Sequence, residues 1–222
     1  MRLFVGIPLA DAVARELGNA IARLREGEHS MPGSRLRWTA PDSWHITLQF
    51  LGNAAEEQLE CLKARLGEVR ATAFPIQLGA LGCFDRAGVF FADVMVTPEL
   101  AALERSVVAA TSPCGFAAET RPFHPHITLA RAKGHGRRPE LRALESKVRS
   151  QSAFTRFTAA EFVLYESHLG NAERAMRPGC ASHWQAGPAQ GQPPITDILK
   201  IRQGDGARCC VRLGCAPSAR KH

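Results

Sequence analysis

The sequence predicts an α+β fold built from two similar lobes related by a pseudo-twofold axis, each lobe with an antiparallel sheet and outer helices. The tetrad His-Ile-Thr-Leu occurs twice, at residues 45–48 and 126–129. Each copy follows a proline-containing turn and alternates polar with apolar residues, which is typical of a half-buried strand. Strand-like and helix-like segments recur in a similar order around both copies, and this repetition indicates two related halves.

The elements of the first half follow from composition and spacing. Residues 2–9 are apolar and β-forming, so they predict a strand. Residues 10–26 predict an amphipathic helix, because their apolar side chains recur three and four positions apart. The helix expected at residues 54–71 carries its acidic residues early, where the helix dipole favours them. The remaining expectations here are a short strand at 36–39 and a longer strand at 45–52.

The second half repeats this order. A helix is predicted at residues 97–112, with Thr97 as N-cap and Pro98 at the first helical position. A turn at 85–88 separates two strand-like segments, and a further helix is expected near the end of this half. The ranges expected here are strands at 74–84, 88–96 and 126–131, a helix at 138–150, and one or two strands within 154–167.

Alternation along the two tetrads divides their side chains between two faces. His45, Thr47 and Gln49 share one face of the first strand, and His126 and Thr128 share one face of the second. The opposite faces carry Ile46, Leu48, Phe50, Ile127 and Leu129. If the pseudo-twofold axis brings the strands face to face, the His and Thr sides line a shared cleft and the Ile and Leu sides enter the lobe cores.

Two imidazoles in one cleft can divide acid–base work, because the unperturbed pKa of histidine lies near neutrality. One takes a proton from an attacking water, and the other gives a proton to a leaving oxygen. The hydroxyls of Thr47 and Thr128 point the same way and can donate hydrogen bonds to an anionic oxygen. Phosphate is the guest that suits this arrangement, and displacement at a strained cyclic phosphate requires no metal.

Three neighbouring residues are further candidates. Arg131 lies on the opposite parity from Thr128, so its guanidinium reaches the phosphate only if the strand ends or bulges there. Phe123 precedes a proline turn and is a candidate for stacking on a nucleobase. For Phe50 we expect core packing, and for His124, which shares parity with His126, a solvated loop position is favoured over a role as second base.

Composition limits the other function classes. The net charge is +7, but residues 171–222 supply +5 of it, so the body of the chain does not have a strongly basic character. No apolar run is long enough to cross a bilayer, and we expect a cytoplasmic monomer without cofactor or metal. Without any CxxC pair, Cys61, Cys83 and Cys114 are interpreted as scattered small apolar residues.

At these residues the chain resembles a known family. Two H-x-T-x motifs in a two-lobed α+β fold mark the 2H phosphoesterases. The segments "MRLFVGIPL", "PDSWHITLQFLG", "FHPHITLAR" and "LYES" resemble the bacterial and archaeal RNA 2′,3′-cyclic phosphodiesterases, also known as 2′-5′ RNA ligases. The resemblance covers about residues 1–170, which are expected to form the two-lobed domain.

The resemblance implies a reaction and a role for each motif residue. The substrate is an RNA end with a 2′,3′-cyclic phosphate, such as that of a tRNA half, and the product is a 2′-phosphate. His45 would be the proton donor to the 3′ oxygen, and His126 the proton acceptor from water. Thr47 and Thr128 would hold the phosphate, with Arg131 helping. The reverse direction would give 2′-5′ RNA ligation, and neither direction would require ATP or metal.

After "LYESHLGNAER" the chain departs from the family pattern. Residues 171–222 are rich in Pro, Gly, Cys and Arg without periodicity, and we expect a poorly ordered tail. The family's last strand is expected to be missing here, which would leave a sheet edge unpaired. One hypothesis for the change in composition is a shift of reading frame near Ala175, and an ordinary extension is the alternative.

Other functions stay open at this point. The same residues would serve a phosphodiesterase acting on ADP-ribose cyclic phosphate or on 2′-5′ oligoadenylates. A non-catalytic RNA- or nucleotide-binding module is a different class, although intact His and Thr in both motifs argue against it. RNA binding by the basic tail alone is a third hypothesis.

Overall fold

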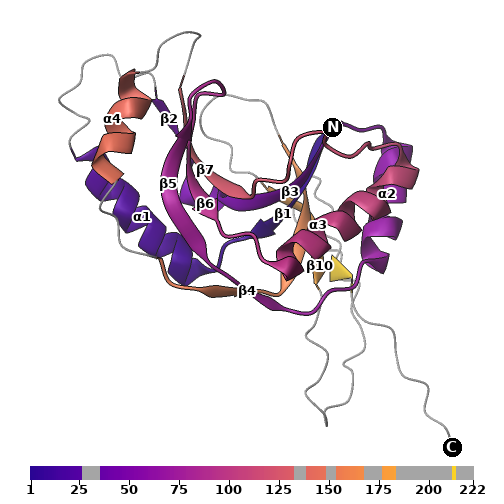
Figure 1. Cartoon of the computed structure of the whole chain (residues 1–222). Coiled ribbons are helices and arrows are strands. Elements are labelled where there is room, and N and C mark those ends of the chain that lie inside the picture. The colour runs from indigo at the N-terminus through magenta and orange to yellow at the C-terminus, as the bar shows by residue number, and fades with distance from the viewer. Residues whose placement is uncertain (27–35, 133–138, 149–153, 168–176, 184–211, 214–222) are drawn as a thin grey trace, which may run out of the picture.

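The computed structural model describes residues 1–26, 36–132, 139–148, 154–167, 177–183 and 212–213 of the chain. The fold is α+β, as the sequence predicts, with four α-helices and two main sheets among these residues (Figure 1). Helices α1 and α4 lie toward one end of the molecule, and α2 and α3 lie toward the other. The helices of each sequence half are therefore divided between the two ends.

The elements of the first half lie where the sequence predicts them. They are β1 (Arg2–Pro8), α1 (Asp11–Arg25), β2 (Leu36–Trp38), the 3-10 turn η1 (Pro41–Ser43), β3 (His45–Asn53) and α2 (Glu56–Glu68). The apolar stripe of α1 is buried, including Val13, Leu17 and Ile21. Burial of this stripe explains why the helical spacing was visible in the sequence.

The second half contains β4 (Phe74–Ile76), β5 (Leu78–Phe84), β6 (Val89–Val94), α3 (Pro98–Thr111), the 3-10 turn η2 (Ser112–Cys114), β7 (His126–Ala132), α4 (Pro139–Val148), β8 (Phe157–Ala159) and β9 (Glu161–Glu166). Thr97 caps α3 as predicted, since its side chain accepts a hydrogen bond from the backbone N–H of Leu100. The single strand expected at 74–84 is two strands, because β4 pairs with β8 whereas β5 pairs with β6.

The two main sheets exchange strands between the sequence halves. One sheet has the order β11-β10-β9-β1-β3, and the other has the order β2-β7-β6-β5. Strand β2 comes from the first half but pairs with β7, and β9 comes from the second half but pairs with β1. Each sheet thus holds a strand from the other half, which ties the two motif strands into one body.

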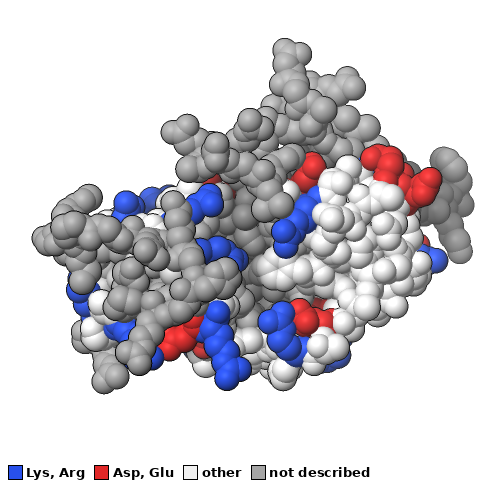
Figure 2. All heavy atoms as spheres, turned by 90° about the horizontal axis from the view of Figure 1, so that it is seen from above, with Lys and Arg blue, Asp and Glu red and all other residues white. Residues whose placement is uncertain are grey.

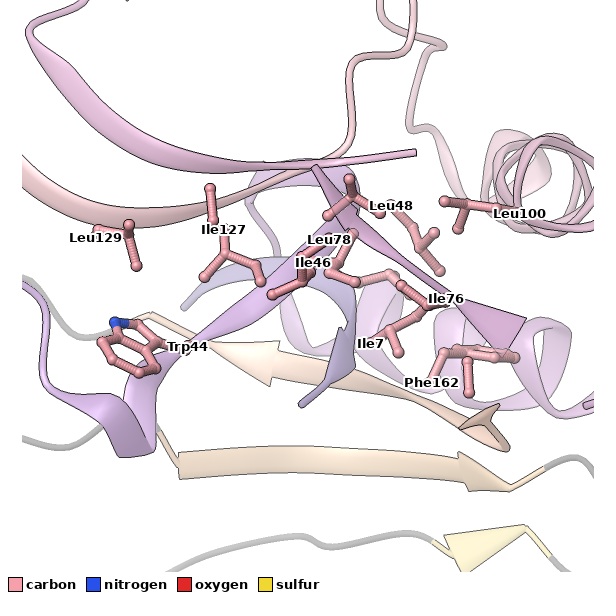
Figure 3. Packing of buried hydrophobic residues seen from close by; sticks show 14 of the residues in the cluster. Ile7, Trp44, Ile46, Leu48, Ile76, Leu78, Leu100, Ile127, Leu129 and Phe162 are labelled. Atoms are coloured by element: carbon pink, nitrogen blue, oxygen red, sulfur yellow. The ribbon is translucent and has the colours of Figure 1, made fainter. Parts of the chain in front are cut away.

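Both tetrads contribute their apolar side chains to one hydrophobic core. Ile46, Leu48, Ile127 and Leu129 are buried and belong to the same continuous cluster. In Figure 3, Ile127 and Leu129 on β7 point toward the layer that holds Ile46 and Trp44. The separate lobe cores expected from the sequence are therefore merged, because β3 and β7 lie against each other.

A disulfide joins Cys61 on α2 to Cys114 in η2, with their Cα atoms 5.7 Å apart. The interpretation of these two residues as scattered small apolar side chains was wrong, because their proximity arises only when α2 packs against the end of α3. Cys83 is partly buried, and its thiol donates a hydrogen bond to the backbone carbonyl of Leu141. The side chain of Gln58 strengthens the same junction by donating to the backbone carbonyl of Cys114.

Residues beyond 170 add to the first sheet. Strand β10 (Arg177–His183) pairs antiparallel with β9, and β11 (Arg212–Leu213) pairs parallel with β10. Strand β10 thus covers the edge of β9, so the prediction of an unpaired sheet edge is not met at that strand. Most of the predicted tail, and therefore its predicted poor order, lies outside the described residues. No helix in the described segments is both long and apolar enough for a membrane span.

Candidate active site

The first motif histidine begins β3 and is held by the turn before it. Nδ1 of His45 lies 2.8 Å from the backbone carbonyl oxygen of Ser43, the last residue of η1. The His45 ring packs on Phe4, with centroids 4.5 Å apart, and on Tyr165, with centroids 5.4 Å apart. Phe4 and Tyr165 are themselves stacked at 4.9 Å. Turn and aromatic pair together fix the orientation of this imidazole.

The second motif histidine has the same arrangement at the start of β7. Nδ1 of His126 lies 2.8 Å from the backbone carbonyl oxygen of His124, again two residues earlier. Its ring meets Phe84 and Phe91 edge-on, with centroids 5.1 and 5.6 Å away. Phe84 and Tyr165 occupy equivalent positions. Tyr165 lies on β9, which pairs with β1 beside β3, and Phe84 lies on β5, which pairs with β6 beside β7.

These two hydrogen bonds determine which ring nitrogen can act. A backbone carbonyl only accepts hydrogen bonds, so Nδ1 carries the proton in both His45 and His126. In the neutral form of each ring Nε2 is then an unprotonated base, and in the charged form Nε2–H is an acid. Both histidines therefore present the same atom for proton transfer.

A β-bulge at the last residue of each tetrad changes which side chains share the histidine face. In the β1–β3 pair Val5 lies opposite Gln49 and Gly6 opposite Thr47, so Leu48 is the extra residue. In the β6–β7 pair Phe90 lies opposite Ala130 and Phe91 opposite Thr128, so Leu129 is the extra residue. A bulge reverses the alternation of faces beyond it.

This reversal changes the faces expected for Gln49 and Phe50, and it supplies the bulge that Arg131 requires to reach the histidine side. Gln49 is buried, whereas Phe50 is exposed, so the core position expected for Phe50 was wrong. Buried Gln49 is satisfied, since it accepts from Thr111 Oγ1 at 2.7 Å and donates to the carbonyl of Ala117. On β7 the bulge returns Arg131 to the side of His126 and Thr128. Phe50 and Arg131 are thus equivalent residues, each five positions after its histidine.

His45, His126 and Arg131 lie near enough for their charges to act on one another. Burial is the main cause that lowers the pKa of His45 to about 4; the nearby charges of His126 and Arg131 contribute to the lowering, and the Ser43 carbonyl opposes it. The pKa of His126 is also lowered, mainly by burial and in part by His124 and Arg131. Both imidazoles are therefore neutral at pH 7 in the free protein, and a bound anion would raise both pKa values.

Arginines concentrate positive charge beside the histidines. Arg37 on β2 lies directly opposite Arg131 on β7, so both side chains project from the same face. The pKa of Arg131 is lowered by burial and by the charge of Arg2. Among the described residues, no ion pair to a carboxylate is found for any of these three arginines. Unpaired like charges at close range repel one another, and an anion would relieve that repulsion.

The remaining candidates lie near the second motif. Thr47 and Thr128 are partly exposed, each between buried neighbours, as the alternation predicted. Exposed His124 is not simply solvated, because its Nε2 lies 2.9 Å from Oδ1 of Asp93. Phe123 is half-buried and packs against the core; its stacking on a nucleobase stays a prediction. Within the described residues no group of three His, Cys, Asp or Glu side chains is placed to hold a metal ion.

Sequence reasoning missed the residues that support the histidines. Phe4 and Tyr165 belong to β1 and β9, and Asp93 belongs to β6, so none is near a tetrad in sequence. Gly6 was missed too: a Cβ there would lie 2.9 Å from the carbonyl oxygen of Ile46 and 3.4 Å from Cδ2 of His45. The pairing of strands alone reveals these contacts, and the repeated tetrad carried no signal for them.

Comparison with known proteins places these motifs in context. A family model described as the 2′-5′ RNA ligase superfamily matches residues 11–171. The chain is 33% identical over 172 residues to a protein named RNA 2′,3′-cyclic phosphodiesterase from Geobacillus stearothermophilus, covering 75% of this chain and 52% of that protein. The chain thus spans about half the length of that relative. A protein of the same name from Archaeoglobus fulgidus is 32% identical over 172 residues, covering 76% of this chain and 92% of its own.

Solved structures show the same fold. Escherichia coli LigT complexed with 3′-AMP superposes with a TM-score of 0.64 at 25% identity, covering 82% of this chain and 97% of that one. The Thermus thermophilus protein TT0787 gives a TM-score of 0.59 at 27% identity, covering 77% of this chain and 90% of that one.

Proposed function

We propose that this chain, which belongs to the 2′-5′ RNA ligase superfamily, is a phosphodiesterase that opens RNA 2′,3′-cyclic phosphate ends to 2′-phosphomonoesters by two-histidine acid–base catalysis. The observation that carries the proposal is the matched state of His45 and His126. Each ring donates from Nδ1 to the carbonyl two residues earlier and presents Nε2, and each lies within electrostatic reach of Arg131.

In the proposed reaction a water attacks phosphorus in line with the 3′ oxygen. Nε2 of His126 accepts the proton of this water as the new P–O bond forms. The bond from phosphorus to the 3′ oxygen breaks, and Nε2–H of His45 protonates that oxygen, leaving a 3′-hydroxyl and a 2′-phosphate. Thr47 and Thr128 donate hydrogen bonds to the phosphate oxygens, and Arg131 balances their charge.

Binding of the substrate prepares the acid. In the free protein His45 has a pKa of about 4, so it is neutral near pH 7 and has no proton on Nε2. A cyclic phosphate carries one negative charge, and that charge beside the ring favours the imidazolium. The same anion offsets the repulsion between His45, His126 and Arg131. His45 would thus become an effective proton donor mainly when the phosphate is in place.

Ligation to a 5′-hydroxyl end would use the same groups. His126 would deprotonate a 5′-hydroxyl instead of water, and attack on the cyclic phosphate would give a 2′-5′ linkage with release of the 3′ oxygen. The proposal includes this direction because the two proton transfers are unchanged. The proposed partner is RNA. That the protein is a monomer and acts in the cytoplasm stays a prediction.

The test is hydrolysis of a nucleoside 2′,3′-cyclic phosphate in EDTA, with the position of the product phosphate read by NMR. The wild type is expected to form the 2′-phosphate without added metal. His45→Ala and His126→Ala should each lose activity by orders of magnitude, whereas Arg105→Ala, at an exposed position of α3, should retain it. Full activity in either histidine variant, or a 3′-phosphate product, would contradict the mechanism.

A further inference from the structure

Phe50 is an aromatic side chain in an unexpected place. It is 59% exposed, and among the large hydrophobic residues exposed in the described part of the chain it is the only aromatic one. Its neighbours Gln49 and Leu51 are both buried. The backbone register therefore holds Phe50 out of the core, because the bulge at Leu48 leaves no alternative face for it.

An aromatic surface connects Phe50 to the first histidine. The Phe50 ring centroid lies 6.0 Å from that of Phe4, and Phe4 lies 4.5 Å from His45. Phe4 also stacks on Tyr165. Phe50 is the exposed end of this surface, whereas Phe4 and Tyr165 are buried.

Arg131, the residue on β7 equivalent to Phe50, shows which groups lie near this position. Arg131 stands five residues after His126, as Phe50 stands five after His45, and both follow a bulge. The charge of Arg131 acts on both histidines, so side chains at this position lie beside the reacting groups. One half of the molecule thus presents a cation there, and the other half presents an exposed ring. Figure 2 shows one face of the surface, on which Lys and Arg lie in several separate groups, some with Asp or Glu beside them.

We propose that Phe50 is a specificity-determining residue that stacks on the base of the nucleotide whose phosphate lies between the histidines. This inference rests on the proposed function and deepens it. A phenyl ring offers a flat apolar surface and no hydrogen-bonding group, so it would select for the presence of a base over its identity. Phe50 would therefore distinguish nucleotides from cyclic phosphates of plain sugars.

The experiment compares two substrates that differ only in the base. One is adenosine 2′,3′-cyclic phosphate, and the other is methyl ribofuranoside 2,3-cyclic phosphate, which has a methoxy group in place of the base. Phe50→Ala is expected to lower kcat/KM for the adenosine substrate about 10-fold or more, because base–aromatic stacking is lost. Its kcat/KM for the base-free substrate should equal that of the wild type. Phe50→Trp should retain the activity of the wild type on both.

Matched controls separate stacking from simple apolar contact. Phe50→Leu keeps apolar area without an aromatic face and should resemble Phe50→Ala. Val96→Ala removes another exposed apolar side chain, at a position before α3, and should change neither substrate. Equal losses on both substrates in Phe50→Ala, or no loss on either, would overturn the inference.

The inference and the proposed function can fail separately. If the wild type turns over neither substrate, the proposed function fails, and titration with adenosine 2′-phosphate and with the base-free phosphate still tests Phe50. Weaker binding of the adenosine ligand alone in Phe50→Ala would support the stacking role, and equal affinities for wild type and variant would refute it.

Discussion

Nε2 of His124 lies 2.9 Å from Oδ1 of Asp93, and the backbone carbonyl of the same His124 accepts the Nδ1 proton of His126. Asp93 also lies directly opposite His126 in the β6–β7 pair. The carboxylate therefore acts on His126 in two ways: it anchors the residue whose carbonyl orients the ring, and its negative charge raises the pKa of the ring. Asp93 is a positioning residue in this arrangement.

Replacement of Asp93 should separate these effects from ordinary packing. In Asp93→Asn the negative charge is gone, so the pKa of His126 falls further and the limb of the pH–rate profile that reports His126 moves to lower pH. The rate at the optimum should also fall, since the His124 side chain loses its charged partner. A pH–rate profile measures both. Glu99→Gln on α3 is the control, and a profile in Asp93→Asn that keeps the wild-type limb would exclude the electrostatic role.

The lowered pKa of His45 predicts an acid-sensitive fold. The unfolded chain protonates this ring near pH 6.5, whereas the folded protein does so only near pH 4. The unfolded state thus binds more protons between these values, and the stability contributed above pH 6.5 is lost as the pH falls toward 4. The full difference between the two pKa values corresponds to roughly 3 kcal/mol in the free energy of unfolding. Partial exposure of His45 makes the loss smaller than this.

Urea unfolding at several pH values measures this loss. His45→Gln cannot titrate, so its free energy of unfolding should decline less than that of the wild type between pH 6.5 and 4. His126 contributes with the same sign, because its pKa is lowered as well. Parallel curves for wild type and His45→Gln would show that His45 is not held neutral in the folded protein.

Gly6 provides the space in which the first histidine sits. An added Cβ would lie 2.9 Å from the carbonyl oxygen of Ile46, so β1 and β3 would have to separate. Gly6→Ala is expected to displace the His45 ring and lower kcat about 10-fold or more, because proton transfer depends on small distances. Gly18→Ala in α1 is the control, since its Cβ has ordinary contact with Trp44 at 3.9 Å and alanine favours the helix. Unchanged kcat in Gly6→Ala would contradict the close fit.

The arginines beside the site predict a preference for longer RNA. Arg37 lies opposite Arg131 and could meet a phosphate further along the strand. Arg37→Gln should lower kcat/KM about 10-fold for an oligonucleotide with a cyclic phosphate end and reduce the salt dependence by about one phosphate contact. A nucleoside 2′,3′-cyclic phosphate has no second phosphate, so its turnover should not change. Equal losses on both substrates would assign Arg37 to the reacting phosphate or to the fold.

The Cys61–Cys114 disulfide predicts a redox-dependent stability. It closes a loop across a sequence separation of 53 residues, so reduction should lower the free energy of unfolding by about 2–4 kcal/mol. Thermal unfolding with and without reductant measures this. Cys61→Ala cannot form the bond, so its Tm should equal that of the reduced wild type both with and without reductant. Cys83→Ala should respond to reductant like the wild type. Identical Tm values for reduced and oxidised wild type would show that the bond contributes no stability.

Local sequence determined most of the secondary structure of this protein and its two catalytic candidates. The helices at 11–25 and 98–111 were readable because apolar spacing and a Thr-Pro start act within a few residues. The repeated His-Ile-Thr-Leu was readable because alternation along a strand requires no knowledge of its partner. Strand 126–132 therefore appeared with its His and Thr on one face, as predicted.

Tertiary structure alone decided which side chains join the histidines. Whether Phe50 and Arg131 face the core or the site depends on a one-residue bulge at Leu48 and Leu129, and a bulge is a property of two paired strands. The ring contacts of Phe4 and Tyr165, and the Asp93–His124 pair, likewise join residues far apart in sequence. The Cys61–Cys114 disulfide was invisible for the same reason. Local patterns determined the elements and the reactive groups, and strand register, which is set by long-range pairing, determined the surroundings of those groups.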